Sequence, residues 1–187
     1  MTQQEALAFG VPVVLGAARR YRRLQEFILA FVLALVATTM VSTLVPAIGV
    51  YDQIGLTLSD YPNFTPGAYL AQLHDLPLVR DGSLRELDIL KLTGIITFPS
   101  FHSAAAVLYL WALWGVWWIR PAALGASGAM LRSTPLGGGH YFVDVFAGMA
   151  IAVLAIAAAR QTSRWLTAPA APSVVARNAP EAAVAAE

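Results

Sequence analysis

The chain has 187 residues, of which 58% are hydrophobic and only 12% are charged. Soluble domains are nearer half apolar and a quarter charged, so this composition excludes an ordinary water-soluble domain and predicts a membrane protein. The lack of cysteine in the sequence excludes disulfide bonds, thiolate metal sites and a cysteine nucleophile. A formal net charge of +1 gives no reason to expect a nucleic-acid partner.

Four apolar stretches are candidates for crossing the bilayer. A spanning helix needs about 20 mostly apolar residues, and residues 27–50, 101–119 and 141–159 meet that length. The short stretch 121–131 must return the chain to the other side of the membrane, and its Gly and Ala residues suit a span packed inside a bundle. We therefore expect an all-α integral membrane bundle with three to four transmembrane helices.

The two ends of the chain differ from these spans. Residues 6–18 are apolar but too short to cross at about 1.5 Å per residue, so they are either an interfacial segment or the tail of a span. They are not a signal peptide, because the basic cluster follows the apolar stretch instead of preceding it. The Ala/Pro-rich composition from residue 168 onward is typical of disorder. We expect a membrane-embedded domain over residues 1–167 and a disordered cytoplasmic tail over residues 168–187.

Basic residues predict the orientation, because cytoplasmic flanks of membrane spans carry an excess of Lys and Arg. With alternating spans, eight basic residues share one side: Arg19, Arg20, Arg22, Arg23, Arg120, Arg160, Arg164 and Arg177. The other four share the opposite side: Arg80, Arg85, Lys91 and Arg132. The first side is therefore expected to be cytoplasmic, and the loop 51–97 extracytoplasmic, as a partly ordered cap over the mouth of the bundle. We expect a bacterial plasma (inner) membrane protein with its active site facing outside.

Aromatic residues support a membrane interface on the cytoplasmic side. The second long span ends in a tryptophan cluster that is typical of an interfacial belt: Trp111, Trp114, Trp117 and Trp118. The arginines before the first long span are chiefly a topology signal, with contact to anionic headgroups as a secondary effect.

Three ionisable residues lie in or beside the apolar stretches, where such groups are costly and usually functional: His102, His140 and Asp144. Both histidines begin spans that start on the outer side. Asp144 follows His140 by four residues, so on a helix it can accept a hydrogen bond from the imidazole. Pro99 and Ser100 suit a helix start, where free backbone N–H groups bind anions.

These groups fit phosphoryl transfer. A neutral His140 imidazole attacks phosphorus, while Asp144 fixes its tautomer and stabilises the developing positive charge. Protonated His102 donates a proton to the departing oxygen. Helix-start N–H groups and Ser100 hold the phosphoryl oxygens, and water or an alcohol then attacks the phosphohistidine. The scheme uses no metal and no cofactor.

The same residues resemble the motifs of a known family. Pro99-Ser100-Phe101-His102, together with His140 and Asp144, is similar to the Pro-Ser-x-His and His-x3-Asp motifs of the type 2 phosphatidic acid phosphatase superfamily. The forms FPSFHSA and GGGHYFVDVFAG look most like the branch of inositol phosphorylceramide synthases and their bacterial relatives. The resemblance covers roughly residues 23–159. It implies His140 as nucleophile, Asp144 as its partner and His102 as general acid.

The chain departs from the pattern of this family at three points. Thr134 stands where the wider superfamily has a phosphate-binding Arg, an Arg that the lipid-synthase branch also lacks. The first, Lys/Arg-Pro motif is not recognisable. A loop cation (Arg80, Arg85 or Lys91) or Arg132 is a candidate to supply the missing phosphate-binding cation. The six spans of the family do not fit, which suggests a shortened version of its six-helix fold. We expect the phosphate-binding residues to be Ser100, Gly138, Gly139, Thr134 and Arg132.

The expected function is that of a membrane-bound lipid phosphate phosphatase, because water as second nucleophile needs no dedicated pocket. The first alternative is a phospho-headgroup transferase, similar to an inositolphosphotransferase, that acts on a lipid alcohol. The second is a non-catalytic membrane protein or partner subunit, favoured by the missing spans and the missing cation. His102, His140 and Asp144 are also compatible with a zinc site or a structural polar pair. Expected partners are the lipid phosphate substrate and membrane lipids, and the oligomeric state stays open.

Overall fold

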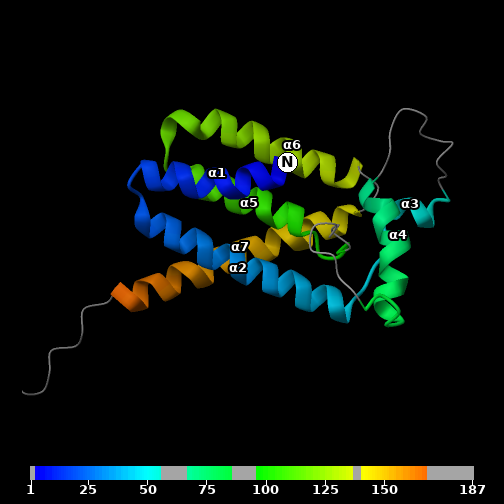
Figure 1. Cartoon of the computed structure of the whole chain (residues 1–187). Coiled ribbons are helices and arrows are strands. Elements are labelled where there is room, and N and C mark those ends of the chain that lie inside the picture. The colour runs from blue at the N-terminus through cyan, green and yellow to red at the C-terminus, as the bar shows by residue number, and fades with distance from the viewer. Residues whose placement is uncertain (1–2, 56–66, 86–95, 137–139, 168–187) are drawn as a thin grey trace, which may run out of the picture.

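The computed structural model describes residues 3–55, 67–85, 96–136 and 140–167. These residues form helices joined by turns and contain no strand, which confirms the expected all-α bundle (Figure 1). The elements in chain order are α1 (Gln3–Ala17), α2 (Tyr21–Leu44), α3 (Val50–Gln53), α4 (Gly67–Arg80), α5 (Phe101–Leu113), a 3₁₀ turn (Trp117–Ile119), α6 (Arg120–Leu136) and α7 (Phe142–Thr167).

The central element is α5, which contacts α1, α2, α6 and α7. Alanines dominate the surfaces that meet there, and eight of them are fully buried: Ala30, Ala34, Ala104, Ala105, Ala106, Ala112, Ala152 and Ala159. Small side chains let helix backbones approach closely. In lipid there is no hydrophobic driving force between helices, so close van der Waals packing is what holds them together. The sequence therefore builds a tight bundle from the stretches that are richest in Ala.

Aromatic side chains fix α2 against the start of α5. The ring of Phe31 meets Phe101 edge-on, with centroids 5.3 Å apart, and lies 6.2 Å from Tyr109. Phe27 lies 6.1 Å from the same Tyr109 ring, which is fully buried. Edge-to-face and offset contacts at these separations are favourable beyond the area that they bury.

The outer surface of the bundle is apolar. Exposed side chains on α2 include Ile28, Val36 and Met40, and on α7 they include Val153 and Leu154. Among the described helices, α2 and α7 are long and apolar enough to cross a membrane. At 1.5 Å per residue they extend about 36 and 39 Å, more than the roughly 30 Å of a hydrocarbon core. These surfaces are suited to lipid.

The observed helices differ from the predicted spans at their ends. The first long span was predicted to reach residue 50, but α2 ends at Leu44, because Pro46 disfavours the helical conformation of the residue before it. The second was predicted to reach residue 119, but α5 ends at Leu113 and the chain turns through Gly115. The helix α6 is longer than its predicted span of 121–131.

The N-terminal apolar segment is part of the bundle. Helix α1 packs against both α5 and α2, and its side chains Val11 and Leu15 are fully buried. The alternative of an interfacial segment is therefore not favoured. The 15 residues of α1 extend only about 22 Å, which is shorter than the roughly 30 Å of a hydrocarbon core, as predicted.

Candidate active site

The two predicted motifs meet where α5 and α7 begin. The Ser100 backbone N–H donates to the Asp144 carbonyl oxygen at 3.1 Å. One turn further along α7, a Cβ built on Gly148 would overlap the Ser100 carbonyl oxygen and lie 3.3 Å from the Ala104 amide nitrogen. A glycine at position 148 therefore lets the two helices approach closely enough to join both motifs in one site.

His140 is held by the backbone of the segment that precedes α5. Its Nδ1 atom lies 2.7 Å from the Thr97 carbonyl oxygen, and the side chain is buried. A carbonyl oxygen can only accept, so Nδ1 carries the proton and donates it. The lone pair of the neutral ring is then on Nε2, which is the tautomer that a nucleophilic imidazole needs.

Asp144 lies beside His140 but is not its hydrogen-bond acceptor. The distance from Asp144 Oδ2 to His140 Nδ1 is 3.6 Å, and the same oxygen accepts the Tyr141 backbone N–H at 2.8 Å. Where the sequence predicted Asp144 as acceptor for the imidazole, the Thr97 carbonyl oxygen takes that place. Asp144 instead caps the start of α7 and places a buried carboxylate next to the ring.

His102 lies in the first turn of α5, with its ring centroid 6.2 Å from that of His140. Its side chain is exposed, whereas His140 is buried. One imidazole is therefore fixed inside the site, and the other is accessible at its edge. This arrangement is compatible with a buried nucleophile and a proton donor that exchanges with water.

The predicted phosphate-binding residues occupy different environments. Ser100 is fully buried and caps α5, accepting hydrogen bonds from the Ser103 backbone N–H at 3.3 Å and the Ser103 hydroxyl at 3.2 Å. Thr134 is buried and donates its hydroxyl proton to the Met130 carbonyl oxygen at 2.7 Å. Arg132 is exposed and makes no hydrogen bond or ion pair with any described residue. Gly138 and Gly139 lie outside the described residues.

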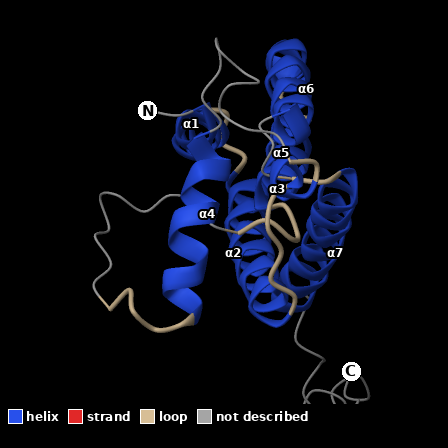
Figure 2. Ribbon diagram, turned by 90° about the vertical axis from the view of Figure 1, so that its right-hand side faces the viewer, coloured by secondary structure: helices blue, strands red, loops and turns tan. Residues whose placement is uncertain are grey.

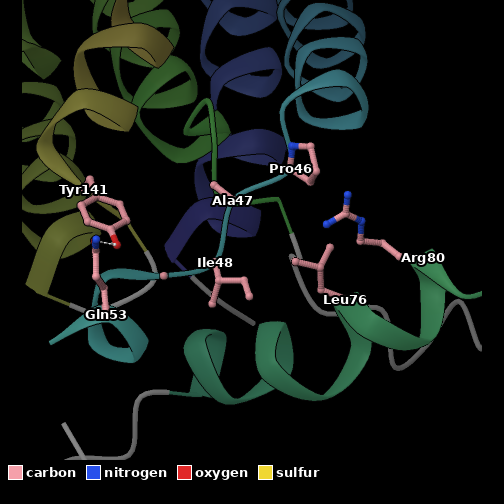
Figure 3. Close-up of a pocket in the computed structure, with 8 residues that line it drawn as sticks. Pro46, Ala47, Ile48, Gln53, Leu76, Arg80 and Tyr141 are labelled. Atoms are coloured by element: carbon pink, nitrogen blue, oxygen red, sulfur yellow. Dashed lines mark hydrogen bonds between the residues drawn. The ribbon is translucent and has the colours of Figure 1, made fainter. Parts of the chain in front are cut away.

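A pocket of about 460 Å³ lies between the segment after α2, the helix α4 and Tyr141. Figure 3 shows Tyr141 and Gln53 on one side of it and Arg80 on the other. The Tyr141 hydroxyl donates to Gln53 Oε1 at 2.6 Å. Arg80, the last residue of α4, has no hydrogen-bond or ion-pair partner within the described ranges. Tyr141 directly follows His140 in the chain and is the lining residue nearest to the candidate nucleophile in sequence; His102, His140 and Asp144 do not line the pocket.

The elements α3 and α4 lie at this end of the bundle (Figure 2). A second tyrosine strengthens their connection, because the Tyr51 hydroxyl donates to the Leu136 carbonyl oxygen at 2.8 Å. The helix α3 is thereby bonded to the end of α6 and the start of α7. Of the other loop cations, Arg85 is exposed, and Lys91 lies outside the described residues.

Three contributors to the site are not among the residues predicted from the sequence. Thr97 acts through a backbone oxygen, which any residue would supply. Gln53 acts through a contact with Tyr141 that joins distant segments. Gly148 could have been suspected, because it lies one turn after Asp144 on the same face of α7.

The zinc alternative needs three or more suitable side chains around one point. In the part of the chain that the structure describes, no three His, Cys, Asp or Glu side chains gather in that way. His102, His140 and Asp144 therefore do not make such a cluster in this arrangement.

A comparison with protein-family models gives the family of the chain. The sequence model of the PAP2 superfamily matches residues 4–158. The chain belongs to the PAP2 superfamily. This match begins before the predicted extent of the resemblance at residue 23, so α1 is part of the family domain. No curated protein and no solved structure matches the chain.

Membership of the PAP2 superfamily sets the general class of the protein. Its members are phosphatases or phosphotransferases, and the chain is accordingly a membrane enzyme of that general kind. The two long apolar helices agree with a location in a membrane.

Proposed function

We propose that this PAP2 protein is a lipid phosphate phosphatase in which His140 forms a phosphohistidine. The observation that carries the proposal is the 2.7 Å contact from His140 Nδ1 to the Thr97 carbonyl oxygen. It holds the ring in the tautomer with a free Nε2 lone pair, without using Asp144 as the acceptor. The neighbouring His102 supplies the second imidazole that the reaction needs.

The first step transfers the phosphoryl group to the protein. His140 Nε2 attacks phosphorus, the bond from phosphorus to the lipid oxygen breaks, and protonated His102 donates its proton to that oxygen. The His140 ring becomes positively charged, with Nδ1–H still donating to Thr97. The Asp144 carboxylate, 3.6 Å from Nδ1, stabilises this charge electrostatically.

The second step returns the protein to its starting state. Neutral His102 accepts a proton from water, the water oxygen attacks phosphorus, and the bond from Nε2 to phosphorus breaks. Inorganic phosphate leaves and His102 is protonated again. The exposure of His102 suits this role, because water can reach it.

The test is phosphate release from a panel of lipid phosphates by the purified protein in detergent. The variant His140→Ala should reduce release to background, and the wild type should form an acid-labile phosphoprotein that the variant lacks. His74→Ala is the matched control, because His74 is exposed on α4 and its side chain pairs with Asp75 next to it in the chain, away from the candidate catalytic residues. Unchanged release by His140→Ala would contradict the assigned nucleophile. A wild type that releases no phosphate from any lipid would contradict the phosphatase proposal.

A phospho-headgroup transferase is the second candidate. The pocket lined by Tyr141, the residue after His140, favours it, because about 460 Å³ is enough space for a small alcohol or headgroup. Gln53, Tyr141 and Arg80 supply polar groups. The resemblance of the motifs to the inositol phosphorylceramide synthase branch points in the same direction. Hydrolysis and transfer differ only in whether water or an alcohol attacks the phosphohistidine.

Product analysis separates the two candidates. Phosphatidylinositol as donor and a lipid alcohol as acceptor are added to the reaction, and released inositol phosphate is measured against the product transferred to the alcohol. A transferase gives mainly transferred product, and Arg80→Gln should lower its share. Arg85→Gln is the control, since Arg85 is exposed and has no partner among the described residues. Absence of any product on the lipid alcohol would contradict the transferase.

We also propose that the site faces the outside of a bacterial plasma membrane. Eight basic residues were predicted to be cytoplasmic, and those that the structure describes lie near the start of α2, the start of α6 and the end of α7. These three helix ends meet at one end of the bundle, and α5 and α7, which carry His102 and Asp144, begin at the other (Figure 1). Cytoplasmic flanks carry the excess of basic residues, which supports this orientation.

A further inference from the structure

A second cluster of charged side chains lies at the end of the bundle opposite His140, where α2, α5 and α7 meet. Arg23 and Arg160 both stand against the indole of Trp111, with their guanidinium carbons 3.9 and 5.4 Å from its ring centroid. Arg23 Nη2 also donates to the Trp111 carbonyl oxygen at 2.7 Å. These three residues are called the Trp111 cluster below.

The positive charge of this cluster is not balanced by the protein that the structure describes. The nearest carboxylate, Glu26, is buried and shared, with Oε1 3.2 Å from Arg22 and Oε2 4.0 Å from Arg23. Arg160 has no carboxylate partner among the described residues. Arg20 and Arg160 both act on Arg23 with like charge. Neighbouring cations that are partly removed from water favour the binding of an anion.

The geometry suits a phosphate group. The planar fork of a guanidinium matches two phosphate oxygens, and the indole of Trp111 brings two such guanidinium groups into one cluster. The indole holds both side chains by cation–π contacts, so fewer rotamers are lost when the anion binds. Arg23 is mostly buried, whereas Arg160 is exposed, so the cluster has both a fixed and an accessible donor.

The surroundings of the cluster indicate where that anion comes from. Four large aromatic side chains at this end of the bundle are more than half exposed: Tyr21, Trp117, Trp118 and Trp165. Exposed Trp and Tyr in membrane proteins lie at the level of the lipid headgroups. The Trp111 cluster is therefore at the depth of phospholipid phosphates.

We propose that Arg23 and Arg160, seated on Trp111, bind the phosphate of an anionic phospholipid in the leaflet opposite the catalytic site. This lipid is a bound partner of the bundle and not its substrate, since it lies at the other end from His140. It neutralises the arginines and links α2, α5 and α7 from outside.

The test measures lipid binding and not turnover, so it is independent of the proposed function. Full-length protein in detergent is supplied with phosphatidylglycerol or phosphatidylcholine, and native mass spectrometry gives the retained lipid and its affinity. The wild type should prefer phosphatidylglycerol. Arg160→Gln should weaken that binding about fivefold, the effect of one arginine at an anionic surface.

Arg164→Gln is the matched control, because it removes the same charge one turn further along α7. The Arg164 side chain is exposed and makes no ring contact, hydrogen bond or ion pair with any described residue. The control should retain the wild-type preference. Equal losses in both variants would mean diffuse attraction by the whole basic end and would overturn the site.

Two further measurements test the guanidinium geometry and the identity of the bound anion. Arg23→Lys keeps the charge of Arg23 but not its fork, so it should also lower the preference for phosphatidylglycerol in a folded protein. An unchanged preference in this variant would overturn the phosphate geometry. In the second measurement, inorganic phosphate competes with phosphatidylglycerol, and phosphatidylglycerol should stay bound. Displacement by equimolar phosphate would show a site for a soluble anion and would overturn the assignment to a lipid.

Discussion

The close approach of α7 to the start of α5 can be tested with one methyl group. In Gly148→Ala, the new Cβ would overlap the Ser100 carbonyl oxygen and lie 3.1 Å from the Ser100 carbonyl carbon. These neighbours are backbone atoms, so they cannot move aside by changing a rotamer. Restoring an ordinary contact distance requires the two helices to separate by about 1 Å.

The cost can be worked from three contributions. Overpacking of this kind costs about 1–3 kcal/mol. The hydrogen bond from the Ser100 N–H to the Asp144 carbonyl oxygen is weakened as the helices separate, at about 1 kcal/mol. Replacing Gly by Ala inside a helix returns up to about 1 kcal/mol. The net loss is about 1–3 kcal/mol, which corresponds to a fall in Tm of roughly 2–12 °C for a chain of this length.

Thermal unfolding in detergent at a fixed scan rate measures this change. Gly128→Ala in α6 is the matched control, since a Cβ there meets nothing within 4 Å and should leave Tm unchanged or slightly higher. Gly148→Ala should also lower turnover, because Ser100 and Asp144 carry the two motifs of the site. Equal Tm and turnover in the two variants would refute the tight contact between α7 and Ser100.

Three further predictions address the charge, the metal and the orientation. Asp144→Asn keeps an oxygen to accept the Tyr141 N–H but removes the carboxylate charge 3.6 Å from His140 Nδ1. Formation of the phosphohistidine should therefore slow about a hundredfold, with Tm little changed. An unchanged rate would show that the charge plays no part. Turnover should survive a metal chelator, and a loss that zinc restores would support the zinc alternative instead. The orientation can be tested with single cysteines and a membrane-impermeant maleimide, because the chain has no cysteine of its own. The maleimide should label Val79→Cys in intact cells and Gln161→Cys only after lysis; both positions are exposed. The reverse labelling pattern would show the opposite orientation.

Much of the fold follows from the sequence, because the bilayer restricts what an apolar stretch can do. Low charge content and long apolar runs were enough to predict a helical bundle with lipid-facing surfaces. The ends of the helices were less predictable. By hydropathy, the tryptophan-rich residues 114–118 are continuous with α5. The chain nevertheless turns at Gly115 and starts α6 at Arg120. Hydropathy measures how a stretch partitions into lipid, and it does not record where the backbone changes direction.

The packing of α1 shows a second limit. Its length argues against a full span, and the structure keeps it short while burying Val11 and Leu15 against the bundle. A short helix can lie inside a membrane protein when longer neighbours cover it. Burial of this kind depends on partners far away in the chain, so a local pattern cannot specify it.

The site illustrates which kinds of interaction a sequence can reveal. His102, His140 and Asp144 are recognisable because their side chains are costly in an apolar stretch and their spacing is regular. The contact that sets the His140 tautomer is different, because its acceptor is the Thr97 backbone oxygen. Asp144 was predicted as the acceptor since it stands four residues along a helix, but α7 begins only at Phe142, so His140 precedes the helix and the spacing rule does not apply to it. Asp144 is then free to accept the Tyr141 N–H and cap the helix. Because α7 starts two residues after His140, two functions are divided between two acceptors: Thr97 orients the imidazole and Asp144 supplies the charge.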